Sequence, residues 1–233
     1  MKKIGIIGGI GPESTIKYYR LIIELFKNKN IKNNYPEILL HSVNMTQMLK
    51  LVFTDNFSGL VDFMKLRIKA LEKAGADYVA MASNTPHIVF NEIANSVDVP
   101  MISIVDEACK KVAKGGHRRV GLLGTRTTMS KGFYQKSADQ FDIEIISPDI
   151  EAQNFIHNKY LGELVYNHII PDTKNELIKI VNQLAREKWI EGIILGGTEL
   201  PLILSQNDFE NIKVFDTTQI HVNAILDRMY EEG

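Results

Sequence analysis

The chain has 233 residues, of which 45% are hydrophobic and 24% are charged, and its formal net charge is -1. This composition is typical of a globular protein with one large domain or two smaller ones. Acidic and basic residues are interspersed, so the charge pattern indicates neither a nucleic acid nor a membrane surface as a partner. The single cysteine, Cys109, excludes an internal disulfide and a cysteine-based zinc site.

The first predicted element is the apolar run from Lys3 to Gly9. The run is short, and its glycines lead into a helical pattern, which argues against a signal peptide. No stretch approaches the roughly 20 apolar residues that span a bilayer. We expect a cytoplasmic protein.

Short apolar runs alternate with helical patterns along the rest of the chain. Most of the runs are continuously apolar, as in parallel strands that are buried on both faces. The predicted strands, in chain order, are Lys3–Gly8, Glu37–Val43, Asp77–Ala82, Met101–Ile104, Arg119–Gly124, Ile143–Ser147, Gly192–Gly196 and Ile212–Phe215. The predicted amphipathic helices are Ser14–Lys29, Phe57–Ala74, Thr173–Glu187 and Thr217–Met229. In the first helix, one face is expected to carry Ile16, Tyr19, Ile22, Ile23 and Phe26.

The two halves of the chain resemble each other. The run that starts at Lys3 parallels the run at Arg119, with an offset of 116 residues, and the run at Ala76 parallels the run at Ile190, with an offset of 114. We predict two similar three-layer α/β/α domains with parallel sheets, related by an approximate twofold axis. The predicted domains are residues 1–98 plus 216–233, and residues 99–215.

The expected place of the site follows from the parallel sheets. Ligands of open parallel sheets bind beyond the carboxyl ends of the strands. Two such ends that face each other form a cleft, into which the loops after Gly8, Ala82, Gly124 and Gly196 point. We therefore expect the active site in the interdomain cleft.

The loop after the first strand resembles a nucleotide-binding turn. Gly9 and Gly11 supply half of a dinucleotide fingerprint, but Ser14 stands where the third glycine belongs and Pro12 changes the turn. A tight strand-to-helix turn, with Ser14 or Thr15 near the helix N-cap, explains the same residues. Backbone N–H groups of such a turn also bind carboxylates, so Gly9 is a predicted substrate-binding residue.

The loop after the third strand is rich in polar residues. Asn84 and Thr85 offer an amide and a hydroxyl to a carboxylate or an ammonium group. Ser83 and His87 are residues that can serve as a nucleophile and its base. The Gly-x-Ser-x-Gly motif that would indicate a serine hydrolase is absent from this loop. A histidine on an ordinary helix face is the alternative explanation of His87.

The second half has corresponding loops. Thr125 and Thr127 follow its first strand and are interpreted as substrate-binding residues, although threonines also cap helices. Gly197, Thr198 and Glu199 follow the strand that parallels the third. Glu199 is a candidate base or ammonium ligand, or else an acidic residue in the first turn of a helix.

Together these motifs resemble the aspartate/glutamate racemase family, across essentially the whole chain. The family patterns Gly-Gly-x-Gly-Pro-x-(Ala/Ser)-Thr, Cys-Asn-Thr-x-His and Gly-Cys-Thr-Glu correspond to residues 8–15, 83–87 and 196–199. The two catalytic cysteines of the family are here replaced by Ser83 and Gly197. The resemblance implies a homodimer that racemises an amino acid with neither pyridoxal phosphate nor a metal, and so without a cofactor.

The replaced positions bear on the chemistry that the resemblance implies. One thiolate of the family removes the Cα proton, while a thiol on the opposite face returns one. Thiols suit both steps because their pKa of about 8.5 is easily tuned towards neutrality. A serine hydroxyl is a far weaker acid, and glycine has no side chain, so the two-thiol pair is absent. Cys109 aligns with neither motif and is expected to pack inside a helix.

Several functions stay open. The expected ligand is a small amino acid or carboxylate, and among these aspartate or glutamate. Against an acidic ligand, Thr46 and Gln47 stand where some family members carry an arginine. Three explanations of the replaced cysteines stay open. One is a deliberate replacement that traps a bound substrate, and another is a divergent one-base isomerase, lyase or decarboxylase that uses Glu199 or His87. The third is a non-catalytic binding protein.

Overall fold

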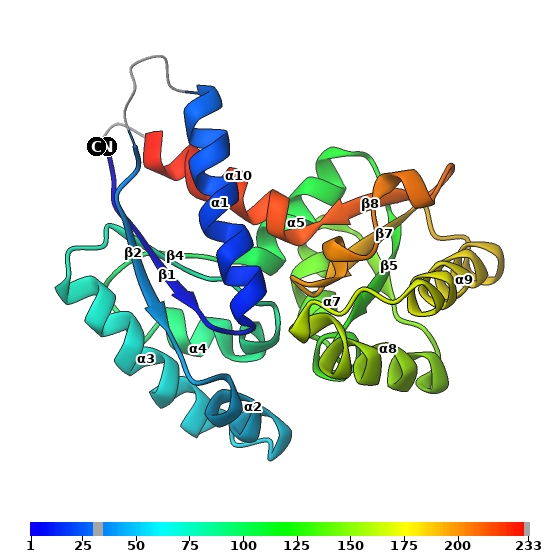
Figure 1. Ribbon diagram of the computed structural model, residues 1–233, viewed down its shortest axis with the longest axis horizontal. Helices are drawn as coiled ribbons and strands as arrows, with labels where there is room; N and C mark the ends of the chain where they lie inside the picture. The colour runs from blue at the N-terminus through cyan, green and yellow to red at the C-terminus, as the bar shows by residue number, and fades with distance from the viewer. Residues whose placement is uncertain (30–34, 231–233) are drawn as a thin grey trace. The chain divides into compact units, whose positions relative to one another are not determined.

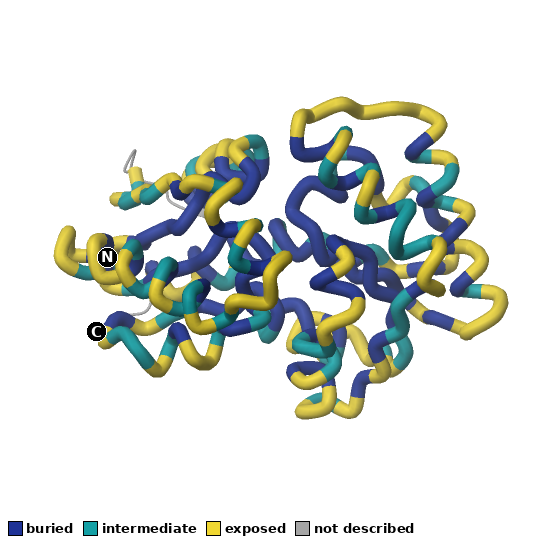
Figure 2. The backbone as a smooth tube through the Cα atoms, turned by 90° about the horizontal axis from the view of Figure 1, so that it is seen from below, coloured by how far each residue is buried: buried dark blue, intermediate teal, exposed yellow. Residues whose placement is uncertain are grey.

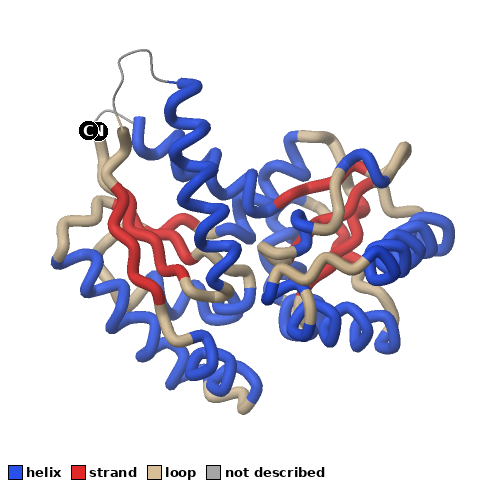
Figure 3. Tube along the Cα trace, in the orientation of Figure 1, coloured by secondary structure: helices blue, strands red, loops and turns tan. Residues whose placement is uncertain are grey.

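The computed structural model describes residues 1–29 and 35–230, which contain two four-stranded parallel sheets flanked by helices (Figures 1 and 3). The chain divides into two compact units. The first comprises residues 1–104 and the segment from His221 onward, and the second comprises residues 105–220. These boundaries lie six and five residues further along the chain than the predicted ones, which ended domain segments at 98 and 215.

The sheet of the first unit has the strand order β2-β1-β3-β4. Its strands are β1 (Ile4–Gly8), β2 (Ile38–Ser42), β3 (Tyr78–Met81) and β4 (Met101–Ile102). Every neighbouring pair is parallel. The predicted strands in this half are therefore confirmed, and β1 lies in the interior of the sheet.

The sheet of the second unit has the same topology, β6-β5-β7-β8. Its strands are β5 (Arg119–Gly124), β6 (Glu144–Ile146), β7 (Gly192–Gly196) and β8 (Lys213–Asp216), again all parallel. β5 therefore occupies in its sheet the place that β1 occupies in the other. This is the equivalence predicted from the glycine-ended runs.

The registers of the two sheets make the equivalence specific to single residues. Ile7 of β1 lies opposite Met81 of β3, and Leu123 of β5 lies opposite Leu195 of β7. These pairs reproduce both sequence offsets. Ser83 lies two residues after Met81, and Gly197 lies two residues after Leu195. Ser83 and Gly197 are therefore equivalent positions in the two units.

The first unit has three layers. Helices α1 (Pro12–Lys29) and α10 (Thr217–Tyr230) cover one face of its sheet, and α2 (Met45–Phe53), α3 (Phe57–Lys73) and α4 (Phe90–Ala94) cover the other (Figure 1). Alternate residues of β1 serve the two cores, since Ile6 packs with Ile225 of α10 whereas Ile7 packs with Ile68 of α3. Burial of both faces explains why these strands are continuously apolar.

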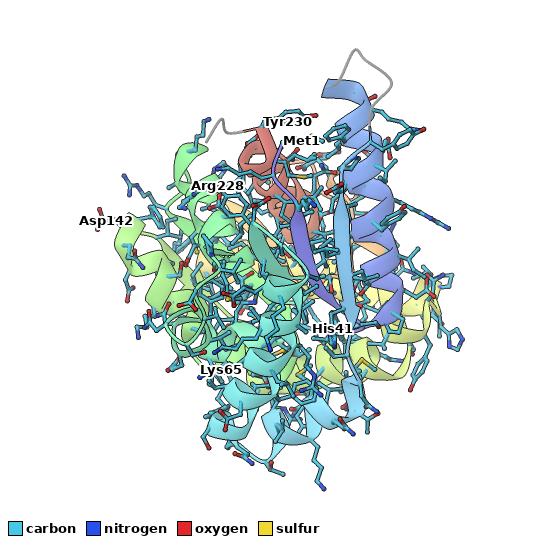
Figure 4. The ribbon with its side chains drawn as sticks, turned by 90° about the vertical axis from the view of Figure 1, so that its left-hand side faces the viewer. Met1, His41, Lys65, Asp142, Arg228 and Tyr230 are labelled. Carbon is cyan, nitrogen blue, oxygen red and sulfur yellow. The ribbon has the colours of Figure 1, made fainter. Side chains whose placement is uncertain are left out.

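The first residues of the chain lie beside the end of α10. Met1 and Tyr230 lie near each other (Figure 4), and the Lys2 N–H donates to the Met229 carbonyl over 3.4 Å. The part of α10 from Val222 onward contributes to the core of this unit. This part of α10 therefore packs with the first unit.

One predicted helix face is wrong in part. In α1 the buried apolar residues are Tyr18, Ile22 and Phe26, of which Ile22 and Phe26 were predicted, whereas the predicted Ile16 and Tyr19 are 45% and 51% exposed. The sequence of α1 offers two apolar stripes, and spacing alone does not choose between them. The stripe with Tyr18 is buried because its hydroxyl meets His221 of α10, so the tyrosine enters the core with its polar group satisfied.

The second unit surrounds its sheet with helices from several parts of the chain. They are α5 (Ile104–Lys114), α6 (Arg126–Ser130), α7 (Phe133–Ala138), α8 (Ile150–Gly162) and α9 (Pro171–Lys188). The two interior strands, β5 and β7, are almost completely buried, and buried backbone is dark blue in Figure 2. Helix α9 lies close to β5, because Leu184 would touch a side chain placed at Gly121. In the described ranges 1–29 and 35–230, no helix is both long and apolar enough to cross a membrane.

Candidate active site

Buried polar residues gather at one end of each sheet. Among the described residues, all of them except Ser137 and Thr173 lie within seven residues after the carboxyl end of a strand. Buried polar groups are costly unless they are paired or bind a ligand. The carboxyl ends of parallel strands are also the usual place for a ligand. This distribution marks the strand-end loops of both units as the candidate site.

The turn between β1 and α1 is held by side-chain hydrogen bonds. Gly9 has a φ of +84°, a conformation that favours glycine. The Gly9 N–H donates to the Thr15 hydroxyl over 2.8 Å, and Ser14 and Thr15 both donate to the Gly11 carbonyl. The tight-turn explanation therefore describes this loop. A contact of Gly9 with substrate stays a prediction.

The loop after β3 carries Ser83, Asn84 and Thr85 in buried positions. Asn84 precedes a 3-10 helix over Thr85–Val89, in which Pro86 occupies an early position that suits proline. The Ser83 hydroxyl makes no hydrogen bond to any of the described residues. A buried hydroxyl of this kind is available to a ligand, which is the role the sequence predicts for this loop.

His87 is buried in the same loop and is uncharged. Its Nε2 accepts a hydrogen bond from the Ile104 N–H over 3.3 Å, which places the proton on Nδ1. Nδ1 has no partner with hydrogen-bond geometry among the described residues, although the backbone of Ser83 and Asn84 lies near it. Burial and, to a smaller extent, the nearby His221 lower the pKa of His87 to about 3. The imidazole stacks on Phe90.

A second buried histidine, His221, supports the same region. Its Nε2 donates to the Ile102 carbonyl over 3.0 Å, so its Nδ1 accepts from the Tyr18 hydroxyl at 2.9 Å. Burial lowers its pKa to about 4. The two histidines thus fix the backbone on either side of Ser103, which follows the end of β4.

The threonines after β5 divide into two kinds. Thr125 caps α6, since its hydroxyl accepts from the Thr128 N–H at 3.3 Å and lies 3.1 Å from the Thr128 hydroxyl. The Thr127 hydroxyl has no hydrogen bond to another residue in the part of the chain that the structure describes. Thr125 therefore acts as a cap, and the buried Thr127 presents the freer hydroxyl of the pair.

At the end of β7, Tyr160 occupies the space beside Gly197. A Cβ placed on Gly197 would lie 2.4 Å from Cε2 of the Tyr160 ring and 3.0 Å from its hydroxyl oxygen. Distances this short are incompatible with a side chain at position 197 unless the ring moves. Tyr160 comes from α8, where it and Ile156, one turn earlier, are the buried residues.

Glu199 is buried beside this tyrosine. Its Oε2 accepts hydrogen bonds from the Tyr160 hydroxyl and, over 3.0 Å, from the Thr198 hydroxyl. Burial raises the pKa of Tyr160 well above its ordinary value, and the charge of Glu199 raises it further. Tyr160 is therefore a protonated phenol whose hydrogen points at a carboxylate.

Cys109 lies away from these loops, within α5. Its side chain is buried, and burial raises the pKa of the thiol to about 11. A protonated, buried thiol is a poor nucleophile. The structure thus agrees with the prediction that Cys109 packs in a helix.

Sequence reasoning missed Tyr160 and His221. Neither residue stands in a motif, and each meets its partner only when distant elements pack together. A weak signal for His221 existed, because it lies in the predicted helix Thr217–Met229. Tyr160 had no such signal, because α8 was not among the predicted helices.

Comparison with known proteins gives the same fold. The chain is similar to the crystal structure of an aspartate racemase homologue from Pyrococcus horikoshii OT3, with 37% identity and a TM-score of 0.85 over 99% of this chain and 100% of that one. It is also similar to a putative Asp/Glu racemase from Yersinia pestis, with 30% identity and a TM-score of 0.89 over 99% and 100%.

A curated relative and a family model extend the comparison. The broad specificity amino-acid racemase RacX of Bacillus subtilis strain 168 is 29% identical over 159 residues, which are 63% of this chain and 64% of that protein. The chain thus spans less than two thirds of the length of this relative. The model of the Asp/Glu/Hydantoin racemase family matches residues 7–225. The chain belongs to the Asp/Glu/Hydantoin racemase family.

Proposed function

We propose that this protein binds a small acidic amino acid, aspartate or glutamate, through the strand-end loops of its sheets, and that it lacks the two-thiol racemisation of its family. The observation that carries this proposal is the gathering of buried polar residues at the carboxyl ends of the strands. In each unit a position equivalent to a family cysteine lies among or directly beside these residues, Ser83 in the first and Gly197 in the second.

The residues have distinct proposed roles. The Ser83 and Thr127 hydroxyls, together with the polar groups of Asn84 and Thr85, bind the carboxylates and the ammonium group of the ligand. Gly9, Thr125 and Thr198 complete the set of proposed substrate-binding residues. His87 and Glu199 are the remaining candidates for acid–base chemistry. Of these two, Glu199 is better supported, because the Nε2 of His87 is occupied by a backbone N–H and its pKa lies at about 3.

A second function is favoured by the buried Glu199. A single carboxylate beside a phenol suits a one-base enzyme, that is, an isomerase, a lyase or a decarboxylase acting on an amino acid. A non-catalytic amino-acid-binding protein is the third candidate. All three share the binding step, which is therefore the step to test first.

Calorimetric titration with both enantiomers of aspartate and glutamate tests the binding step. We expect one of these four ligands to bind more tightly than leucine or lysine. Asn84→Ala should weaken that binding roughly 10-fold, because it removes hydrogen bonds worth about 1.4 kcal/mol. The matched control is Asn91→Ala, at an exposed position of α4 in the same unit. Failure of all four acidic ligands to bind would refute the proposal.

The remaining expectations rest on the family resemblance. We propose that the protein is a cytoplasmic homodimer that uses neither pyridoxal phosphate nor a metal. Light scattering after size-exclusion chromatography measures the mass in solution, for which we expect twice the 26.4 kDa of one chain. Dialysis against a chelator should leave ligand binding unchanged.

A further inference from the structure

We propose that Tyr160 takes the place of the missing second thiol, and that its phenol and the Glu199 carboxylate form the proton-exchanging pair of the second unit. The inference rests on the proposed function in one respect, since it treats the loop after β7 as part of the amino-acid site. It adds a catalytic residue that no motif identifies, and it names the atom that meets the Cα proton.

The Tyr160 phenol lies close to the position that a thiol at residue 197 would take. The hydroxyl oxygen of Tyr160 lies 3.0 Å from the place where the Cβ of a residue 197 side chain would begin. A family thiol would be attached to that Cβ, so the phenol occupies the neighbourhood of the thiol. The ring fits only because position 197 is glycine, since a Cβ would approach Cε2 to 2.4 Å. The loss of the cysteine and the presence of Tyr160 are therefore two parts of one arrangement.

The hydrogen-bond partner of the Tyr160 phenol is the buried carboxylate of Glu199. Glu199 is 1% exposed, and its Oε2 accepts hydrogen bonds from both the Tyr160 and the Thr198 hydroxyls. A buried carboxylate that receives two hydroxyl donors is fixed in place, and the phenol hydrogen of Tyr160 is already directed at it. The raised pKa of Tyr160 means that the phenol does not ionise by itself. Proton transfer through Tyr160 therefore requires Glu199 as the final acceptor.

Tyr160 and Glu199 together permit one proton-transfer step at Cα. The Cα–H bond of the amino acid breaks, and its proton binds to the Tyr160 oxygen. The original phenol proton moves at the same time to the Glu199 carboxylate, and the electron pair stays on the substrate as an enolate. The reverse transfer restores the amino acid. Because the proton leaves and returns through the same phenol, the returning proton gives the original configuration.

Deuterium exchange tests the step directly. The natural chiral amino acids, as separate L and D enantiomers, are incubated with the protein in deuterium oxide, and loss of the Cα proton is followed by NMR. We expect exchange with one enantiomer of the preferred ligand and no change in its configuration. Tyr160→Phe keeps the ring beside Gly197 but removes the hydroxyl, and should slow exchange roughly 100-fold or more. Binding of the ligand should stay within a few-fold of the unchanged protein, so the loss appears in the rate.

Two further variants separate catalysis from folding. Glu199→Gln keeps the shape of the acceptor but removes the base, and should lose exchange to a similar extent. Tyr134→Phe removes the hydroxyl of another buried tyrosine of the same unit and should exchange at the original rate. A merely structural role of the Tyr160 hydroxyl would lower stability or binding without a selective loss of exchange.

The outcomes divide cleanly. Loss of exchange in both Tyr160→Phe and Glu199→Gln supports the pair, whichever amino acid reacts. If the amino acid that exchanges is not acidic, the pair stands and only the proposed ligand class is wrong. Absence of exchange with every amino acid overturns the pair, even if aspartate or glutamate binds. Exchange that survives in Tyr160→Phe, or that is lost equally in Tyr134→Phe, overturns it as well.

Discussion

Gly197 and Tyr160 account for each other at the scale of single residues. Glycine at the end of a buried strand is often explained by backbone conformation, but no left-handed φ occurs at Gly197. The reason is space, because the Tyr160 ring occupies the volume of a side chain. A cysteine at this position therefore requires a second change, at Tyr160. The sequence identified position 197 from its motif, whereas the tyrosine that fills it comes from a helix with no local signal.

Gly197→Ala tests this spatial argument. The added methyl group must displace the Tyr160 ring, so we expect a loss of about 1–3 kcal/mol in the free energy of unfolding, as in other overpacked cores. The control is Gly162→Ala, near the end of α8, where a Cβ meets nothing within 4 Å. That variant should be neutral or up to about 1 kcal/mol more stable. Urea unfolding measures both, and equal stability of the two variants would contradict the argument.

His87 and His221 make stability depend on pH. Their pKa values of about 3 and about 4 in the folded protein lie below the unperturbed value of about 6.5. Between these limits the unfolded chain binds protons that the folded chain excludes. The stabilisation is therefore complete above about pH 6.5 and is lost as the pH falls towards the folded pKa values, at up to about 1.4 kcal/mol per pH unit for each histidine.

Urea unfolding at pH 7, 6 and 5 measures this dependence. We expect the free energy of unfolding to decrease with each step towards acid, and His221→Gln to reduce the slope. His168→Gln, at an exposed position, should leave the slope unchanged. An unfolding free energy that stays constant from pH 7 to pH 5 would show that the two histidines are not kept neutral.

At the scale of elements, strands were easier to predict than helices. All eight strands were predicted, because strands buried on both faces are continuously apolar. The helix α8 was not, since its apolar residues are spread around the axis and only Ile156 and Tyr160 are buried. In α1 the spacing permitted two apolar faces, and the hydrogen bond between Tyr18 and His221 decides which one enters the core. Such choices depend on the partner element, which local sequence does not contain.

The turn between β1 and α1 provides a test at this scale. Thr15→Val keeps the shape of the side chain but leaves the Gly9 N–H without its hydroxyl acceptor. An unpaired buried donor costs about 1–3 kcal/mol, and we expect a loss of that size in the free energy of unfolding. Thr54→Val removes an exposed hydroxyl that donates to the Lys50 carbonyl, and should change stability by less than about 0.5 kcal/mol. The account of the turn fails if both variants lose the same stability.

At the scale of the whole molecule, one architecture occurs twice. The two sheets share strand order and register, and this follows from repeated sequence runs at offsets of 116 and 114 residues. The duplication and the family were therefore predictable from the sequence. The chemistry was predictable only in part, because the motifs reveal the missing thiols and the candidate base Glu199 but not the Tyr160 phenol beside position 197. That the loops after β3 and β7 serve one ligand stays a prediction.

Restoring the thiols requires the change at Tyr160 as well. We expect Ser83→Cys with Gly197→Cys to gain little activity, because the second cysteine collides with the Tyr160 ring. Adding Tyr160→Ala makes room for the thiol, and the triple variant should interconvert the enantiomers of the bound amino acid. Activity in the double variant equal to that of the triple variant would mean that the ring moves aside without cost.

The most direct test of the central claim is the enantiomer content of L-aspartate and of L-glutamate after incubation with the unaltered chain, measured by chiral chromatography. The account predicts that neither D enantiomer accumulates above the level of a protein-free control, even where deuterium enters at Cα. Accumulation of D-aspartate or D-glutamate towards an equal mixture would contradict it, since the chain would then racemise without cysteines at positions 83 and 197.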